Sequence, residues 1–422
     1  MKWYRSDERI PINRAIKKRR KGRRPVRCPI RGRLNIKTMK QLQEKLEAIF
    51  QDFHRHPEIS AKEFRTTKKI KEYLAEWGVR LIALPLPTGA LAEIGTGNGP
   101  VAALRCDLDA LPVQEETGLP YASEVPGRMH ACGHDFHMTS VLGAAMLLKE
   151  REPRLKGTVR LIFQPAEEIN EGADPMLRTG LLGDVSEYYG IHADPEIDAG
   201  TLGIREGAVM ACPDHFRIRI QGRGGHGAQP HLSLNPIPCA ASAALALQQA
   251  VPGKISPFSP CVLSVCRIQA GDAWNVIPGQ ALLEGTLRTM SDMDRATGIS
   301  AIRQIAEYTA KAWGCTAETV FFPAPPPVVN NAGLAAFAAE TARSLGIGVI
   351  RQEPGMIGED FAEYLREKPG CFIRVGTGIG PGLHHSKFRA DPSALSGTAE
   401  YLAELVVRRL DKMSGSQSGK ES

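Results

Sequence analysis

The chain has 422 residues, 42% hydrophobic and 23% charged, a composition typical of an ordinary globular protein of two or three domains. Its apolar residues never run together for the roughly 18 positions that a membrane-spanning helix needs, and no apolar signal segment follows the basic start. We therefore expect no membrane association. Nine cysteines, an odd number without a Cys-x-x-Cys pair, favour free thiols in a reducing cytoplasm over a disulfide framework.

The net charge of +7 is unevenly distributed along the chain. Residues 1–38 hold fifteen lysines and arginines against two acidic residues, a local charge of +13, which leaves −6 for the remainder. Because these residues lack apolar periodicity, we interpret them as a disordered extension or the product of a mis-assigned start codon. Binding of nucleic acid or an anionic surface is the less favoured alternative, since no later segment interleaves aromatic with basic residues.

The first predicted elements alternate between helices and strands. Apolar residues spaced as on one helix face open the folded part just after Met39, and a second helix is expected over about 61–77. Strands that alternate with helices predict a mostly parallel sheet covered on both faces, with ligands gathering at the carboxyl ends of the strands. The expected strands are 101–106, 158–163 and 188–192, and the helix between the first two is 137–149.

A different pattern follows residue 210. Residues 214–220 alternate strictly between polar and apolar, as a half-exposed strand does. The predicted order strand–helix–strand–strand–helix–strand is that of a ferredoxin-like unit. Its later elements are a helix over 236–250, strands over 260–269 and 280–289, a helix over 293–313 and a strand over 315–322.

The proline-rich residues 323–327 predict a stiff linker that leads back to the first domain. Helices over 332–345 and 393–410, with a strand over 371–375 between them, complete that domain. The predicted fold is therefore α/β: a mostly parallel sheet sandwiched by helices, with an inserted ferredoxin-like α+β domain. The expected boundaries are 39–210 and 324–414 for the catalytic domain, 211–323 for the insertion, and 415–422 for a disordered tail.

Three clusters of polar residues lie at the ends of predicted strands, in residues 105–112, 129–137 and 164–168. Cysteine, histidine and carboxylate together suit ions such as zinc, cobalt or manganese. Each cluster alone is more often a packed turn or a solvated helix start, but their shared position at strand ends favours a metal site. The candidate ligands are Cys132, His134, His192, His384 and one member of the pair Glu167 and Glu168. The side chains of this pair point apart, so one can bind metal while the other acts as general base.

The inserted domain adds three candidate residues. His226 lies in a glycine-rich segment, and its alternative reading is an incidental histidine in a hairpin loop. No phosphate-loop pattern occurs there. Functionally, His226 could donate a hydrogen bond to an oxyanion, while Asn275 and Arg288 could hold a carboxylate; for Arg288 the alternative is a solvated strand residue.

Because these motifs occur in the expected order along the chain, it resembles the aminoacylase and carboxypeptidase family of co-catalytic metallopeptidases. Within it, the chain is most similar to the branch of hippurate hydrolase, N-acyl-amino-acid amidohydrolases and indoleacetyl-amino-acid hydrolases. The resemblance covers about residues 40–412. It rests on the segments His54–Glu58, Arg105–Pro112, Met129–Asp135, Phe163–Glu168, Gly224–Ala228, Asn275–Pro278, Gly358–Phe361 and Leu383–His384.

The resemblance implies that Cys132, His134, Glu168, His192 and His384 bind two divalent ions of manganese, zinc, cobalt or nickel, and that Glu167 is the general base. It implies that Asp109 orients a ligand histidine, with Asp107 as an alternative, and that His384 is preferred to His385. It further implies that His226 stabilises the transition state, often across a dimer interface. Asn275 and Arg288 match positions that hold the substrate carboxylate.

The expected function is therefore a cytoplasmic, metal-dependent amidohydrolase that cleaves N-acyl amino acids (hippurate-, acetyl- or indoleacetyl-amino-acid-like). The expected reaction is attack by metal-bound hydroxide with Glu167 as general base. A dipeptidase, or a deacetylase of an N-acylated biosynthetic intermediate, would use the same site. A non-catalytic binding protein is disfavoured because all the motif residues are intact. The resemblance also implies that the inserted domain is a lid or dimerisation domain, so the expected assembly is a homodimer formed through it.

Overall fold

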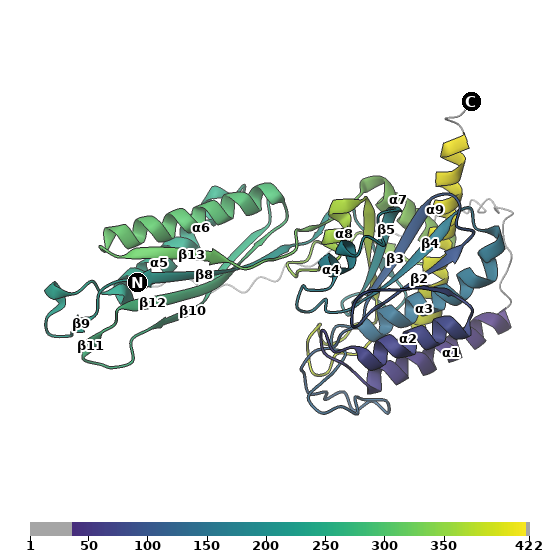
Figure 1. Cartoon of the computed structure of the whole chain (residues 1–422), viewed down its shortest axis with the longest axis horizontal. Coiled ribbons are helices and arrows are strands. Elements are labelled where there is room, and N and C mark those ends of the chain that lie inside the picture. Colours follow the sequence, from purple (N-terminus) through teal and green to yellow (C-terminus); the bar gives the residue numbers. More distant parts are fainter. Residues whose placement is uncertain (1–35, 419–422) are drawn as a thin grey trace, which may run out of the picture.

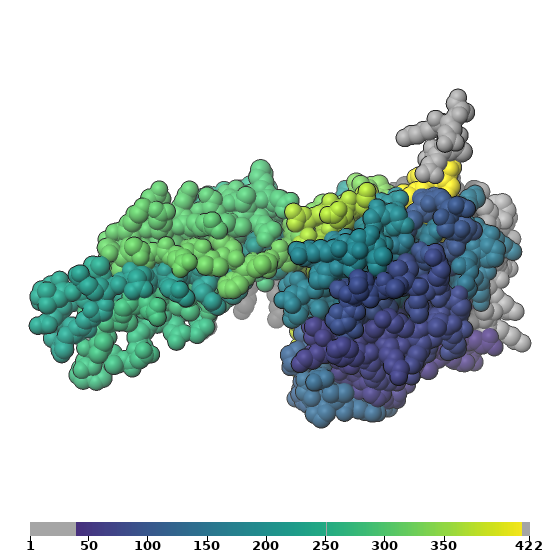
Figure 2. All heavy atoms as spheres, viewed as in Figure 1, coloured from purple at the N-terminus to yellow at the C-terminus, as the bar shows by residue number. Residues whose placement is uncertain are grey.

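Two sheets organise residues 36–418, which are the residues that the computed structural model describes. They lie in two lobes joined by a narrow connection (Figures 1 and 2). We call the lobe with the eight-stranded sheet the large domain, and residues 212–321 the inserted domain. Within the described residues, no helix is long and apolar enough to cross a membrane.

The large sheet has the strand order β1-β2-β4-β3-β5-β16-β6-β15. Its central strands β4, β3, β5 and β16 are parallel to one another, and β1 and β2 pair antiparallel with their neighbours. Strand β6 pairs antiparallel with β16 and parallel with β15. The strands are β1 (Arg80–Ile82), β2 (Ala90–Gly95), β3 (Val101–Asp107), β4 (Thr158–Gln164), β5 (Val185–Asp194), β6 (Leu202–Gly203), β15 (Val349–Ile350) and β16 (Gly370–Gly376). Strands β3, β4 and β16 are buried along their whole length, as their continuous apolar runs predict.

Helices cover both faces of this sheet. On one face lie α1 (Ile36–Arg55), α2 (Phe64–Glu76), α3 (His134–Arg151), α7 (Ala332–Ser344) and α9 (Leu395–Ser418). On the other lie α4 (Ala173–Arg178) and α8 (Ala362–Glu367). Helix α3 is buried over nearly all its length because it packs between α1, α9 and the sheet, and its residues 141–148 are apolar on every side.

The inserted domain has the expected order of elements, and its sheet has the order β10-β12-β8-β13. Helices α5 and α6 cover one face and form a separate core, while the other face is open. The elements are β8 (Cys212–Gln221), α5 (Pro236–Ala250), β10 (Cys261–Ala270), β12 (Gln280–Thr289), α6 (Asp292–Ala312) and β13 (Thr316–Phe321). Two small ladders complete the chain: β9 (Gly225–His226) with β11 (Val276–Ile277), and β7 (Gly207–Met210) with β14 (Val328–Asn330).

The predicted fold class is confirmed, and three boundaries differ. Helix α1 begins at Ile36, inside the segment expected to be disordered, and α3 begins three residues earlier than expected. The expected disordered tail was wrong for residues 415–418, which continue α9. Helix hydrogen bonds propagate beyond the last buried residue, and the Ser414 hydroxyl donates to the Lys156 carbonyl (2.6 Å), anchoring this end. The interpretations of residues 1–35 and 419–422 lie outside the described residues.

Candidate metal centre

The candidate ligands come from four places in the chain that the parallel sheet brings to one edge. Glu167 and Glu168 follow the carboxyl end of β4, and His192 lies near the end of β5. Cys132 and His134 flank Gly133, whose left-handed φ of 85° forms the turn into α3. His384 lies in the loop after β16, where its backbone N–H donates to the Ala131 carbonyl (2.8 Å).

The five candidate ligands form two groups of donor atoms that share Cys132. Its thiol lies with His134 and His192 in one group and with Glu168 and His384 in the other, and within each group the donor atoms lie within 4.8 Å of one another. Cys132 Sγ is 3.4 Å from His192 Nε2, and His384 Nε2 is 3.4 Å from Glu168 Oε2. His385 instead accepts a hydrogen bond from the Lys387 N–H (3.0 Å), so the geometry favours His384 as the ligand.

Asp109 connects this cluster to the sheet. Its Oδ1 lies 3.3 Å from His134 Nδ1, closer than Asp107 Oδ1 at 3.8 Å. Its two carboxylate oxygens accept the backbone N–H groups of Glu167 (3.1 Å) and Glu168 (3.0 Å). Asp109 therefore fits the orienting role better than Asp107, since it contacts a candidate ligand and also holds the backbone of the two glutamates.

The donor atoms suit a cation. Among residues 36–418, His134 Nε2 and Glu168 Oε1 are buried without a hydrogen-bond partner, which is costly for polar atoms that bind nothing. The His192 Nδ1–H donates to the Ala193 carbonyl (2.7 Å), which leaves Nε2 free as a ligand. Burial raises the pKa of the Cys132 thiol well above its usual range, and Glu168 raises it further, so a thiolate here needs a bound cation. The residues present therefore fit divalent metal ions.

Glu167 lies beside this cluster in a buried, acidic environment. Burial raises the pKa of its carboxyl well above its usual range, and Glu359 and Asp360 raise it further. One oxygen from each of these three carboxyls lies within 4.8 Å of the others. A carboxyl whose protonated form is stabilised in this way is suited to receiving and returning a proton at neutral pH.

The sequence interpretation missed the residue that holds these carboxyls together. The fully buried Arg105 donates to Asp107 (2.7 Å), to Asp360 (2.6 Å) and to Gln164 (2.9 Å), and it lies 3.0 Å from Glu359. An arginine in an otherwise apolar, buried strand is a sequence feature that could have revealed this role, because such a charge needs partners.

A second missed residue is His137, one turn into α3. Its Nε2 accepts the Ala193 N–H (2.6 Å), so the proton lies on Nδ1, which donates to Asp107 (2.6 Å). Ala193 directly follows the candidate ligand His192, and His137 therefore fixes the end of β5 that carries this ligand. Its spacing of three residues from His134 on the same helix was the available signal.

The three candidates of the inserted domain lie apart from this cluster in the same chain. We call the end of the domain with β9 and β11 the tip, and the end with Thr289 the base. His226 and Asn275 lie at the tip, on the side of the domain that points away from the large domain (Figure 1). Arg288 lies at the base, where its Nε–H donates to the Met356 carbonyl of the large domain (3.1 Å).

Tip and base are far apart. The ten residues of β12 run from one to the other and span roughly 30 Å at the usual rise of a strand. One chain therefore cannot place Asn275 and Arg288 on the same small substrate. The structure brings together Cys132, His134, Glu167, Glu168, His192, His384 and Asp109, and it separates His226, Asn275 and Arg288 from them.

Comparison with known proteins shows that the chain is a hydrolase that acts on amide bonds. Residues 103–408 match the model of peptidase family M20/M25/M40. The chain belongs to this family.

Relatives and a solved structure agree with this assignment. The chain is 46% identical over 358 residues to an N-acetylcysteine deacetylase of Bacillus subtilis, covering 84% of this chain and 94% of that protein. It is 37% identical to an IAA-amino acid hydrolase of Arabidopsis thaliana, covering 87% of each. The crystal structure of Bacillus subtilis YXEP, described as a dinuclear metal binding peptidase, superposes with a TM-score of 0.81 at 43% identity, covering 88% of this chain and 99% of that one.

Proposed function

We propose that this protein is an amidohydrolase of N-acyl amino acids that uses two divalent metal ions held by Cys132, His134, Glu168, His192 and His384. The observation that carries the proposal is the pair of donor groups that share the Cys132 thiol, with Glu167 beside them. A shared ligand is what two neighbouring ions need, and five ligands leave positions open for water and substrate.

The chain's own residues divide the work of hydrolysis. Bound metal ions would polarise the substrate carbonyl and acidify a water molecule. Glu167 accepts the proton of the attacking water and then returns it to the nitrogen of the leaving amine, so that proton transfer balances over the reaction. Asp109 holds the backbone of Glu167 and orients His134 while this occurs.

The names of relatives support the substrate class. The deacetylase and the IAA-amino acid hydrolase both act, by name, on an acylated amino acid, although with acyl groups of very different size. A dipeptidase, or a deacetylase restricted to one biosynthetic intermediate, remains the second candidate, because the same metal centre would serve it. We retain the cytoplasm as the proposed location, since the eight cysteines among residues 36–418 are all free.

A substrate panel tests this proposal. The purified protein is incubated with manganese, zinc, cobalt or nickel and with N-acetyl, N-benzoyl and indoleacetyl amino acids, alongside unacylated dipeptides. We expect release of the free amino acid from the N-acyl compounds with at least one metal. Faster hydrolysis of the dipeptides would favour the second candidate, and no hydrolysis of either group would reject both.

We further propose that the active unit is a homodimer in which His226 serves the metal centre of the other copy. His226 Nδ1 accepts the Ala228 N–H (3.1 Å), which leaves an exposed Nε2–H as a donor for an oxyanion. Strand β10 is an edge of the inserted domain's sheet and pairs on one side only, with β12, among the described residues. Exposed apolar side chains lie on this strand, at Val262 and Ile268, and on α5, at Leu245. Such an edge is suited to pairing with a second copy.

Mixing two inactive variants tests whether His226 acts in the second copy. His226→Ala and Glu167→Gln are each expected to be nearly inactive. If the two are unfolded and refolded together in equal amounts, half of the dimers are hybrids, and each hybrid has one intact site. We therefore expect recovery of about one quarter of the wild-type rate by statistical assortment. Recovery no greater than the sum of the separate variants would contradict the shared site.

A further inference from the structure

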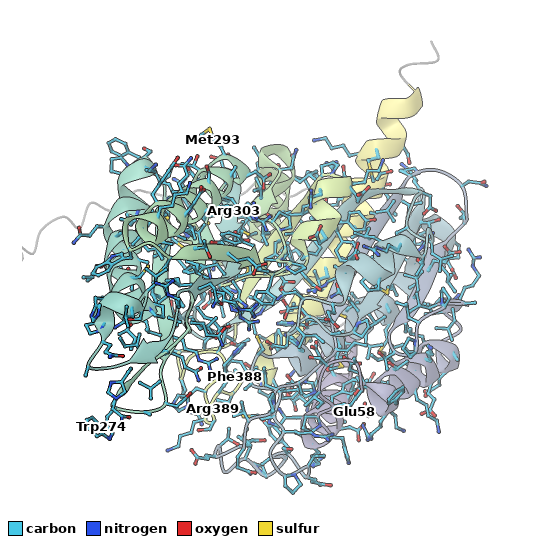
Figure 3. All side chains as sticks on the ribbon, turned by 60° about the vertical axis from the view of Figure 1, so that its left-hand side comes forward. Glu58, Trp274, Met293, Arg303, Phe388 and Arg389 are labelled. Carbon is cyan, nitrogen blue, oxygen red and sulfur yellow. The ribbon has the colours of Figure 1, made fainter. Side chains whose placement is uncertain are left out.

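The tip of the inserted domain exposes an unusual group of apolar side chains. Trp274 is 97% exposed and Leu232 is 58% exposed, and Val276 and Ile237 are also exposed. Figure 3 shows Trp274 standing out from the end of the ribbon. All four belong to the segments that neighbour the exposed His226. A free indole is rare on a protein surface, and apolar groups that gather near a polar donor mark a contact site.

The backbone fixes Val276 next to His226 and ties the turn that carries Trp274 to the same strand. Val276 pairs directly with His226 in the β9–β11 ladder, so their side chains lie on the same face. The Gly227 N–H donates to the Asn275 carbonyl (2.8 Å), which ties the strand carrying His226 to the turn carrying Trp274. The backbone of the turn that carries Trp274 is therefore held close to the strand that carries the proposed oxyanion donor.

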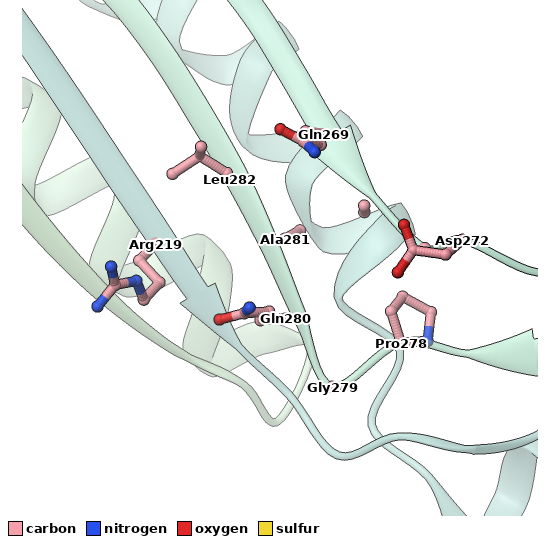
Figure 4. A pocket seen from close by; sticks show the side chains of 10 residues that line it. Arg219, Gln269, Asp272, Pro278, Gly279, Gln280, Ala281 and Leu282 are labelled. Carbon is pink, nitrogen blue, oxygen red and sulfur yellow. The ribbon is translucent and has the colours of Figure 1, made fainter.

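The turn with Trp274 also stands clear of its own domain. A hollow of about 430 Å³ is lined by Gly271 and Asp272 of the segment that leads to Trp274, but not by Trp274 itself (Figure 4). The inserted domain thus offers the indole no covering surface, as its exposure of 97% shows. A surface that covers Trp274 would therefore come from another molecule.

The loops around the metal centre also expose apolar side chains, which could contact those of the tip. Ile169 directly follows Glu168 and is 46% exposed, and Ile379, in the loop that leads to His384, is 69% exposed. The second copy of the chain therefore has apolar side chains on the loops of its metal centre, to which His226 would be delivered.

We propose that Trp274 is a specificity-determining residue, which enters the metal centre of the second copy with His226 and forms an apolar wall of the substrate pocket there. This inference rests on the proposed function and dimer. It assigns to the enzyme a preference for substrates with a large apolar, preferably planar, group next to the scissile amide. That group belongs either to the acyl part or to the amino-acid side chain, and an indole face suits both.

A panel of four substrates tests the proposal and separates the two sources. N-acetylglycine has neither group, N-benzoylglycine has an aromatic acyl group, N-acetylphenylalanine has an aromatic side chain, and N-benzoylphenylalanine has both. For Trp274→Ala we expect kcat/KM to fall at least about tenfold on one of the two singly aromatic substrates and less than about threefold on N-acetylglycine. Trp274→Phe should restore most of the loss.

Phe258→Ala is the matched control, because Phe258 is equally exposed (95%) but precedes the end of β10 that pairs with Thr289 at the base. It should leave all four values unchanged, and both variants should keep the oligomeric mass of the wild type. An equal effect of Trp274→Ala on all four substrates, or no effect, would overturn the role of Trp274 while leaving the amidohydrolase intact. Failure of the wild type on every substrate would overturn the proposed function together with this inference.

Discussion

Replacing Glu167 by glutamine is expected to lower kcat by about 10²–10⁴, the usual contribution of a general acid/base, with little change in bound metal. The amide keeps the size of the side chain but cannot accept a proton. Glu167 lies within 4.8 Å of the donor atoms of His134 and Glu168, but it belongs to neither of the two donor groups that share Cys132, so we expect those donors to stay in place. The measurement is kcat on the best N-acyl amino acid, with metal content determined by elemental analysis on the same preparation.

The matched control is Glu171→Gln, an exposed glutamate four residues further along the same loop, which should retain the wild-type rate. Near-normal turnover of Glu167→Gln would reject the assigned base. Loss of metal from this variant would instead assign Glu167 to the ligand set.

Replacing Arg105 by methionine is expected to destabilise the protein by about 3–5 kcal/mol, the usual result of removing one partner of a buried ion pair. The change removes the positive charge between Asp107, Glu359 and Asp360, all of which are buried. The pKa of Glu359 is already raised to about 8, by burial first, and the loss of Arg105 would raise it further. The readout is the denaturant midpoint of the large domain.

Arg65→Met provides the comparison for this effect. Arg65 also donates to a carboxylate, that of Asp52 (2.7 Å), but its side chain is partly exposed, so its loss should cost less than about 1 kcal/mol. Equal stability of the two variants would contradict the role assigned to the buried arginine.

The sequence was sufficient to predict that the candidate ligands lie together, because their chemistry and their place in the chain agree. Cys132, His134 and Glu168 belong to residue types that bind metal, and all follow predicted strands whose carboxyl ends meet at one edge. The alternation of residues 214–220 likewise predicted β8, since one face of that strand is buried and the other open.

The remaining features depend on partners that are distant in the sequence. In the sequence, Arg105 is a charged residue in an apolar strand without an evident partner. Its partner Asp360 lies 255 residues later in the chain. The antiparallel strands β1 and β2 were missed because they are short and precede the strongly apolar β3. Asn275 and Arg288 are only thirteen positions apart in the sequence. Their sequence positions therefore gave no sign that they lie at opposite ends of one sheet.

Titration of the metal-free protein with cobalt or manganese, with hydrolysis of an N-acyl amino acid and bound metal measured at each step, tests the metal centre most directly. The account predicts no hydrolysis without metal, a rate that rises to a plateau at about two ions per chain, and loss of at least one of these ions from Cys132→Ser. Full hydrolysis by the metal-free protein, or unchanged metal binding by Cys132→Ser, would contradict it.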